Sequence, residues 1–174
     1  MKRLIAFVLF IGFFMACNDK ADSDAASTTA APPPPVQLPY ELQYKSWEMG
    51  DPANVKLVLD MYENWENNQM EATVAAFADS TTFDFPSGNH ASLTSANILD
   101  SFKVWRSYSG TISTDVISAL SIHSTDKNED WVTIWSFGRW TDRNGKADSS
   151  FSNDNWQIKN GKITYLSSLE QKSR

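Results

Sequence analysis

Apolar positions in the region after residue 40 recur first with a helical period and then with a period of two. The helical pattern starts at Asp51-Pro52, an N-cap residue followed by proline in the first turn. It predicts helices over residues 52–66, 70–78 and 95–105. A short strand is predicted over residues 81–85, between the second helix and the third.

After Gly110 the alternation of apolar and polar residues predicts four consecutive strands. They cover residues 112–123, 130–141, 146–158 and 162–169. Asn144-Gly145 is a strong hairpin signal, and Asn160-Gly161 marks the next turn. Helices followed by an antiparallel meander predict an α+β fold, with the helices gathered on one face of the sheet.

The turn at Asn144-Gly145 decides which side chains share a face of the sheet. A two-residue turn places Trp135 opposite Asp154, and opposite residues share a face. The face toward the helices would then carry Trp135, Phe137, Asp154 and Trp156. The apolar residues expected on the other, outer face are Val132, Ile134, Trp140 and Phe151. So much apolar surface is not left in water, and a homodimer through the outer face is expected to cover it.

The first 39 residues lack this patterning. A basic start and an apolar run from Leu4 to Ala16 are typical of a secretory signal peptide and too short for a membrane span. The stretch from Asn18 to Pro39 has almost no large apolar residue and contains four successive prolines, which predicts a disordered but stiff spacer. The expected organisation is a cleaved signal peptide (1–16), a lipidated cysteine with its spacer (17–39) and one domain (40–174).

Cys17 is the only cysteine of the chain, so the domain has no internal disulfide. Phe14-Met15-Ala16-Cys17 resembles the lipobox of bacterial lipoproteins. The resemblance implies cleavage before Cys17, lipid on its thiol, and a chain anchored to a membrane of the cell envelope on the periplasmic or surface side. The alternative is an ordinary signal peptide followed by an incidental cysteine.

The net charge of −6 excludes two classes of partner. Nucleic acids require clustered Lys and Arg, and so does electrostatic attachment to an anionic lipid surface. Only two histidines are present, His90 and His123, with no cysteine near either, so neither a metal site nor a cofactor is expected.

Residues 70–79 and 82–88 resemble the second helix and first strand of the nuclear transport factor 2-like superfamily, and residues 156–163 resemble its closing strand and turn. The resemblance covers roughly residues 51–169. It implies a cone in which three N-terminal helices pack on a curved, antiparallel-rich sheet and enclose an apolar pocket. Ketosteroid isomerases, SnoaL-like cyclases, dehydratases, epoxide hydrolases and non-catalytic pocket proteins share this fold, so the fold alone does not give a function. Members often pair through the outer sheet face. The residues expected to line the pocket are Trp135, Phe137, Trp156, Phe85 and Trp105.

Asp154 is the main candidate for chemistry. Burial among aromatic rings raises the pKa of a carboxyl group, and a neutral acid can donate a hydrogen bond to an oxyanion. The resemblance aligns Asp154 with the hydrogen-bonding aspartate of ketosteroid isomerases, and Tyr62 with their catalytic tyrosine. The general base of that family is not matched, because Phe85 occupies its position. Asp84 is adjacent but should point to the opposite face.

Two functions therefore remain open. The first is non-catalytic binding of a small apolar or amphipathic molecule in an aromatic-lined pocket. The second is a cofactor-independent cyclase, dehydratase or isomerase that uses Asp154 with Tyr62 or with His90, which is expected in a loop roofing the pocket. What separates them is whether two polar groups converge on one point in the pocket.

Overall fold

The computed structural model describes residues 37–172, and the residues from Tyr40 onward form one compact unit. Cys17, the predicted signal peptide and most of the predicted spacer lie outside the described residues. The helices are α1 (Pro52–Glu66), α2 (Met70–Val74) and α3 (Ser95–Ser107). The strands are β1 (Trp47–Met49), β2 (Phe77–Asp84), β3 (His90–Thr94), β4 (Ser109–Ser124), β5 (Glu129–Asp142), β6 (Ala147–Lys159) and β7 (Lys162–Lys172). None of the helices within residues 37–172 has the length and apolar character of a membrane span.

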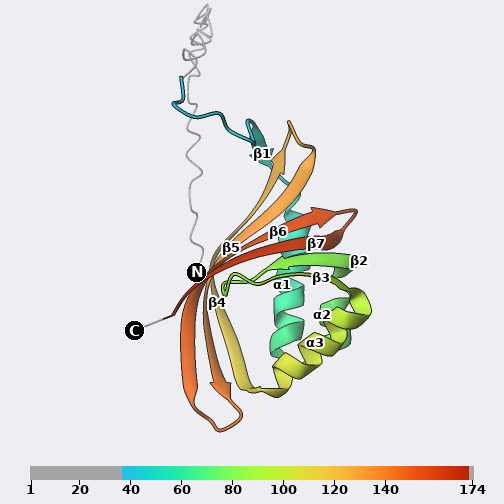
Figure 1. Cartoon of the computed structure of the whole chain (residues 1–174), viewed down its shortest axis with the longest axis vertical. Helices are drawn as coiled ribbons and strands as arrows, with labels where there is room; N and C mark the ends of the chain where they lie inside the picture. The colour runs from blue at the N-terminus through green and yellow to red at the C-terminus, as the bar shows by residue number, and fades with distance from the viewer. Residues whose placement is uncertain (1–36, 173–174) are drawn as a thin grey trace, which may run out of the picture. The chain divides into compact units, whose positions relative to one another are not determined.

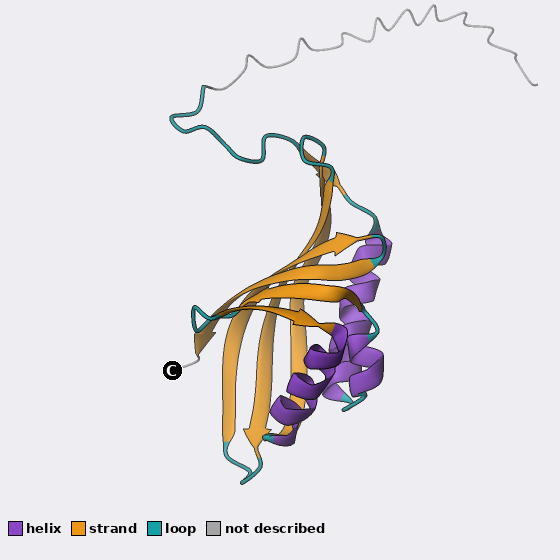
Figure 2. Cartoon of the chain, turned by 45° about the vertical axis from the view of Figure 1, so that its right-hand side comes forward, coloured by secondary structure: helices purple, strands orange, loops and turns teal. Residues whose placement is uncertain are grey.

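Seven strands form a single sheet in the order β1-β4-β5-β6-β7-β2-β3. Strands β4 to β7 are an antiparallel meander, and β2 joins it parallel to β7. The sheet is strongly curved, and the three helices lie against its concave side (Figure 1). Among the described residues no helix covers the opposite face (Figure 2). The predicted α+β architecture of helices on one face of a curved sheet is confirmed.

The helix starts follow the sequence signals. Asp51 caps α1 by accepting the backbone N–H of Ala53 at 2.8 Å, and Thr94 caps α3 by accepting that of Asn97 at 3.3 Å. The second helix is shorter than predicted and ends at Val74. Phe77 is buried as expected, but it begins β2, where it pairs with Ile163 of β7. Pairing with the closing strand thus overrides the local helical spacing.

Two strands were not predicted. Strand β1 is three exposed residues that pair with the end of β4. Strand β3 follows the turn at Pro86 to Gly88 and pairs antiparallel with β2. Its sequence alternates polar and apolar residues, but it has only five residues, and its apolar side chains, Ala91 and Leu93, are only half-buried. The strand signal is therefore short and weak.

The core lies between the helices and the inner face of the sheet. Its centre consists of aliphatic side chains with no solvent exposure: Val58, Ile98, Val132, Ile134 and Ile163. Because side chains alternate along a strand, burial of Val132 and Ile134 defines which positions of β5 point inward.

The predicted register between β5 and β6 is wrong by one residue. Asp154 lies opposite Ile134, and the hairpin closes on the pair formed by Asp142 and Lys146. The loop between them has three residues and ends in Gly145 with φ +81°, a common alternative to the two-residue Asn-Gly turn. The Asp142 carboxylate stabilises it by accepting the backbone N–H groups of Asn144 at 2.8 Å and Lys146 at 2.9 Å.

A one-residue slip reverses the face of every side chain on β5 relative to β6. Trp135 and Phe137 therefore lie on the outer face and not in the pocket, and Trp135 is 41% exposed. Val132, Ile134 and Trp140, expected on the outer face, point inward; only Phe151 of that predicted set is outside.

Candidate functional site

A cavity of about 270 Å³ lies between the helices and the inner face of the sheet. The helices and β2 supply an apolar wall, whereas the sheet supplies a floor that includes several hydroxyl groups. The lining residues from the helices and β2 side are Met61, Tyr62, Trp65, Phe77, Phe83, Phe85, Phe102 and Trp105. Those from the other strands are Ile112, Thr114, Ser136, Gly138, Trp140, Ser150, Ser152, Asp154, Trp156, Leu166 and Ser168. Phe85, Trp105 and Trp156 are thus at the cavity, as expected, whereas Trp135 and Phe137 are not.

The aromatic wall is a continuous set of rings. Phe83 and Phe85 are stacked with their centroids 5.7 Å apart, and Phe85 meets Trp105 edge to face at 5.5 Å. Phe102 of α3 contacts Trp105 at 5.6 Å and Trp65 of α1 at 5.3 Å. Such contacts hold the rings in fixed orientations and so preform an apolar surface for a flat molecule.

Tyr62 of α1 and Asp154 of β6 converge at one end of the cavity. The Tyr62 hydroxyl donates to Asp154 Oδ2 at 2.5 Å, and the Ser168 hydroxyl donates to Asp154 Oδ1 at 2.5 Å. Ser168 can reach Asp154 because it lies on β7, directly opposite Asp154 on β6. The convergence of two polar groups that a catalytic function requires is therefore present at Tyr62 and Asp154.

Burial shifts the ionisation of both groups. Burial raises the pKa of Asp154, and this exceeds the opposing effect of the hydrogen bonds from Ser168 and Tyr62. The pKa of Tyr62 is raised well above its usual value by burial and by the nearby Asp154 carboxylate. Both oxygens of Asp154 are already paired with the hydroxyl groups of Tyr62 and Ser168, so neither oxygen is free of a protein partner.

Replacing Asp154 by asparagine should change how stability depends on pH. A carboxyl whose pKa is raised by folding supports the folded state fully below its unfolded pKa, and that support is lost as pH rises through the folded pKa. Relative to wild type, Asp154→Asn should therefore gain unfolding free energy as pH rises from about 4. Urea unfolding of both proteins at a series of pH values measures this difference.

The matched control is Asp79→Asn, which changes a carboxylate exposed at the surface of β2. It should not reproduce the trend. A difference between Asp154→Asn and wild type that stays constant between about pH 4 and about pH 7 would contradict the described environment of Asp154.

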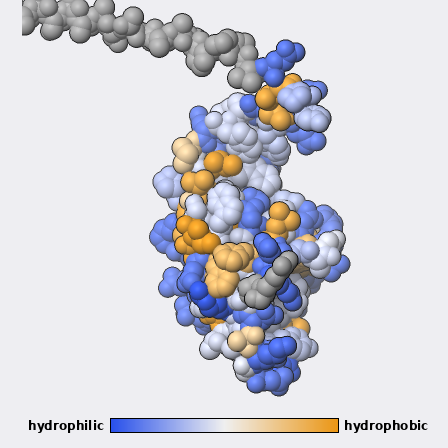
Figure 3. Space-filling view, turned by 90° about the vertical axis from the view of Figure 1, so that its left-hand side faces the viewer, coloured by the Kyte–Doolittle hydropathy of each residue, from blue (hydrophilic) through white to orange (hydrophobic). Residues whose placement is uncertain are grey.

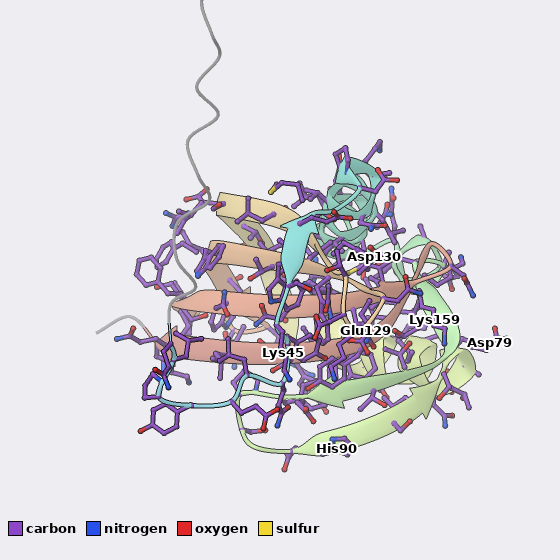
Figure 4. The ribbon with its side chains drawn as sticks, turned by 90° about the horizontal axis from the view of Figure 1, so that it is seen from above. Lys45, Asp79, His90, Glu129, Asp130 and Lys159 are labelled. Atoms are coloured by element: carbon purple, nitrogen blue, oxygen red, sulfur yellow. The ribbon has the colours of Figure 1, made fainter. Side chains whose placement is uncertain are left out.

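His90 is not in a roof over the pocket, contrary to expectation. It belongs to β3, an edge strand of the sheet (Figure 4), and is absent from the cavity lining. Its Nδ1 lies 2.5 Å from Asp84 Oδ1, and Asp84 also accepts a hydrogen bond from the Tyr165 hydroxyl. These two contacts hold the pKa of Asp84 below its usual value. Asp84 points away from the cavity, as alternation from Phe85 predicts.

Tyr62 and Asp154 are the only ionisable side chains among the described residues that line the cavity. Within residues 37–172 no three His, Cys, Asp or Glu side chains are grouped as metal ligands would be. Arg139, on the outer face, pairs with Asp115 at 2.5 Å.

The sequence reasoning missed the hydroxyl-bearing floor of the cavity. Ser150, Ser152 and Asp154 alternate on β6, and Ser136 lies opposite Ser152 on β5. The alternating polar residues were visible in the sequence, but the assumed register gave Ser152 an aromatic neighbour, Phe137. Asp142 is a sequence signal for the longer loop, since an aspartate two residues before Asn-Gly can accept backbone N–H groups of a three-residue loop.

Comparison with known proteins supports the fold. No family model and no curated protein matches the sequence. An LEH-like epoxide hydrolase from M. tuberculosis has 8% sequence identity and a TM-score of 0.58, covering 68% of this chain and 83% of that one. A putative ketosteroid isomerase from Kribbella flavida has 10% identity and a TM-score of 0.55, covering 72% and 83%.

An NTF2-like protein of unknown function from Burkholderia pseudomallei has 14% identity and a TM-score of 0.55, covering 70% of this chain and 91% of that one. Identities this low carry the fold and nothing finer. The chain has the nuclear transport factor 2-like fold, in which helices and a curved sheet enclose a cavity.

Proposed function

We propose that this protein binds a small, uncharged, apolar or amphipathic molecule in the cavity between its helices and its sheet, without catalysing a reaction. The observation that carries the proposal is the continuous aromatic wall facing a cavity of about 270 Å³. Concave, mostly apolar sites with a few fixed polar groups are typical of ligand pockets. The single carboxylate at the site is already paired with the hydroxyl groups of Tyr62 and Ser168.

A fluorescence titration with N-phenyl-1-naphthylamine, a neutral probe that emits in apolar surroundings, tests the proposal. The full chain should bind it at one saturable site. Trp105→Ala removes a ring from the cavity wall and should weaken binding about two- to tenfold. Trp135→Ala, on the outer face, should leave it unchanged. Absence of saturable binding, or equal effects of the two variants, would refute the proposal.

The second candidate is a cofactor-independent enzyme, and the 2.5 Å contact between Tyr62 and Asp154 favours it. Such a pair could accept a proton next to a ketone and stabilise the resulting enolate. Deuterium exchange at the α-carbons of 2-tetralone, followed by NMR in D2O, separates the two candidates. A binding protein should not accelerate the exchange over buffer. Acceleration that Asp154→Asn abolishes would establish the enzyme.

The same proposal includes a lipid anchor on Cys17, which lies outside the described residues. It is supported by the resemblance of Phe14-Met15-Ala16-Cys17 to a lipobox and by the apolar run before it. Several acyl chains together hold a protein stably on a membrane. The cavity would then work in the cell envelope, next to a membrane.

Cys17→Ser should abolish incorporation of a palmitate analogue in cells that make the protein. It should also move the chain from the membrane fraction to the soluble or uncleaved pool. Fluorescent gel detection of the analogue measures the first effect. Labelling that persists in Cys17→Ser would contradict lipidation at this residue.

We further propose that the outer sheet face pairs with a second copy of the chain. The exposed apolar side chains of this face include Ile117, Leu120, Trp135, Phe151 and Leu169. Figure 3 shows hydrophobic side chains gathered in patches between hydrophilic ones on this side. Sedimentation should report a dimer that Leu169→Glu dissociates; a monomeric wild type at every concentration tested would refute the pairing.

A further inference from the structure

The floor of the cavity carries a row of three serines. Ser136 on β5 lies directly opposite Ser152 on β6, and Ser150 is two residues from Ser152 on the same strand. Opposite positions bring Cβ atoms to about 5 Å, and alternate positions on a strand are about 7 Å apart. All three point inward, on the side of the buried Ile134. We call Ser136, Ser150 and Ser152 the hydroxyl row.

These hydroxyl groups belong to buried or half-buried residues and border the cavity. Ser136 is 4% exposed and Ser150 3%. Within the described part of the chain no hydrogen bond involves the side chain of any of the three, whereas Ser168 on the same floor donates to Asp154. A hydroxyl group that borders a cavity without a protein partner is free to bond to whatever fills the cavity, and removing it from water without such a bond costs free energy. The row therefore has hydrogen-bonding capacity that a ligand can use.

A further polar group points to the same conclusion. The indole N–H of Trp156, 5% exposed, is directed toward the Tyr62 hydroxyl but makes no hydrogen bond of normal geometry among the described residues. Its ring lies 6.0 Å from the ring of Tyr62, at the Asp154 end of the floor. Unpaired buried donors are rare in folded proteins unless a ligand, water or ion satisfies them.

The charge of the lining restricts the ligand. No Lys, Arg or His is among the described cavity residues, so nothing there compensates an anion. The only carboxylate, Asp154, already accepts two hydrogen bonds. The opposite wall consists of aromatic rings, which suit the flat face of a ring system. A volume of about 270 Å³ equals that of about nine waters, which is room for one or two rings.

We infer that the hydroxyl row selects an uncharged ring molecule that carries two or more hydroxyl or carbonyl oxygens along one edge, with its apolar face on the aromatic wall. This inference rests on the proposed function, because it specifies the ligand class of the same cavity. It makes Ser136, Ser150 and Ser152 specificity-determining residues.

Equilibrium dialysis of the full chain against naphthalene, 2-naphthol and 2,3-dihydroxynaphthalene tests the inference. These probes share one apolar frame and differ in the number of hydroxyl groups. Affinity should rise about two- to tenfold with each hydroxyl, as one neutral hydrogen bond contributes. In the double variant Ser136→Ala, Ser152→Ala that gain should disappear, while naphthalene should bind at least as well as to wild type.

Ser118→Ala is the matched control, since Ser118 lies opposite Trp135 on the outer face. This variant should bind the hydroxylated naphthalenes more tightly than naphthalene, as wild type does. A fourth probe, phenyl β-D-glucopyranoside, presents the oxygens on a sugar ring. If the glucoside binds more tightly than 2,3-dihydroxynaphthalene, and the double variant abolishes this difference, the natural ligand is a glycoside. If 2,3-dihydroxynaphthalene binds more tightly, the natural ligand is a phenol. Both orders support the hydroxyl row.

Equal affinity of wild type for naphthalene and for both oxygenated ring systems would overturn the inference while leaving the cavity as an apolar binding site. A gain that the double variant keeps would overturn it as well. If wild type binds none of the four probes, both the proposed function and this inference fail.

Discussion

Replacing Gly138 by valine should close the cavity and reduce the affinity for N-phenyl-1-naphthylamine by about tenfold or more. Gly138 lies on the floor opposite Ser150, so its missing side chain is part of the cavity. The three carbon atoms of the valine side chain occupy space that the ligand needs, and a tenfold loss of affinity corresponds to about 1.4 kcal/mol. The fluorescence titration of wild type and variant measures the loss.

The fold should tolerate this change. A Cβ at Gly138 meets no atom closer than the Trp140 ring at 3.9 Å, and its φ is not in the left-handed region. Valine also suits a strand better than glycine. The urea midpoint of Gly138→Val should therefore stay close to that of wild type. The control is Ser118→Val, which introduces a valine on the outer face and should leave the affinity for the probe unchanged. Full affinity in Gly138→Val would mean that the probe binds elsewhere.

The second large effect concerns two neighbouring residues of β5. Ile134→Ala should lower the unfolding free energy by about 2–5 kcal/mol, because Ile134 is completely buried in the core. Trp135→Ala removes a larger side chain, yet it should cost clearly less, since Trp135 is 41% exposed on the outer face. Urea unfolding at a protein concentration too low for association measures both.

This pair tests the register of the β5–β6 hairpin as well as burial. A two-residue turn at Asn144-Gly145 would point Trp135 inward and Ile134 outward, and would reverse the order of the two effects. A larger loss for Trp135→Ala than for Ile134→Ala would therefore contradict the three-residue loop closed by Asp142.

Much of the fold follows from local signals. Asp51-Pro52 and Thr94 mark helix starts through a hydrogen bond within the same turn, so each could be found in the sequence. The four long strands follow from their alternation. Strand β3 alternates as well, but over only five residues with two apolar side chains, which is too short a pattern to identify a strand without its pairing with β2.

The site was harder to predict because it depends on register. Burial of Asp154 and its convergence with Tyr62 were expected, and the structure places the two side chains 2.5 Å apart. The prediction for Trp135 and Phe137 is wrong because the loop between β5 and β6 is one residue longer than expected, which shifts the register and moves both side chains to the outer face. The choice between two and three loop residues was decided by the Asp142 carboxylate, which accepts two backbone N–H groups. The spacing of apolar residues does not reveal side-chain hydrogen bonds within a loop.

A crystal structure of the protein grown with 2-naphthol tests the central claim, that the cavity under α1 and α3 is the binding site, most directly. The naphthol should lie in the cavity, with a ring face on Phe85 or Trp105 and its oxygen within hydrogen-bond distance of Ser136, Ser152 or Trp156. Naphthol bound only on the outer face beside Trp135 and Phe151, and not in the cavity, would contradict the claim.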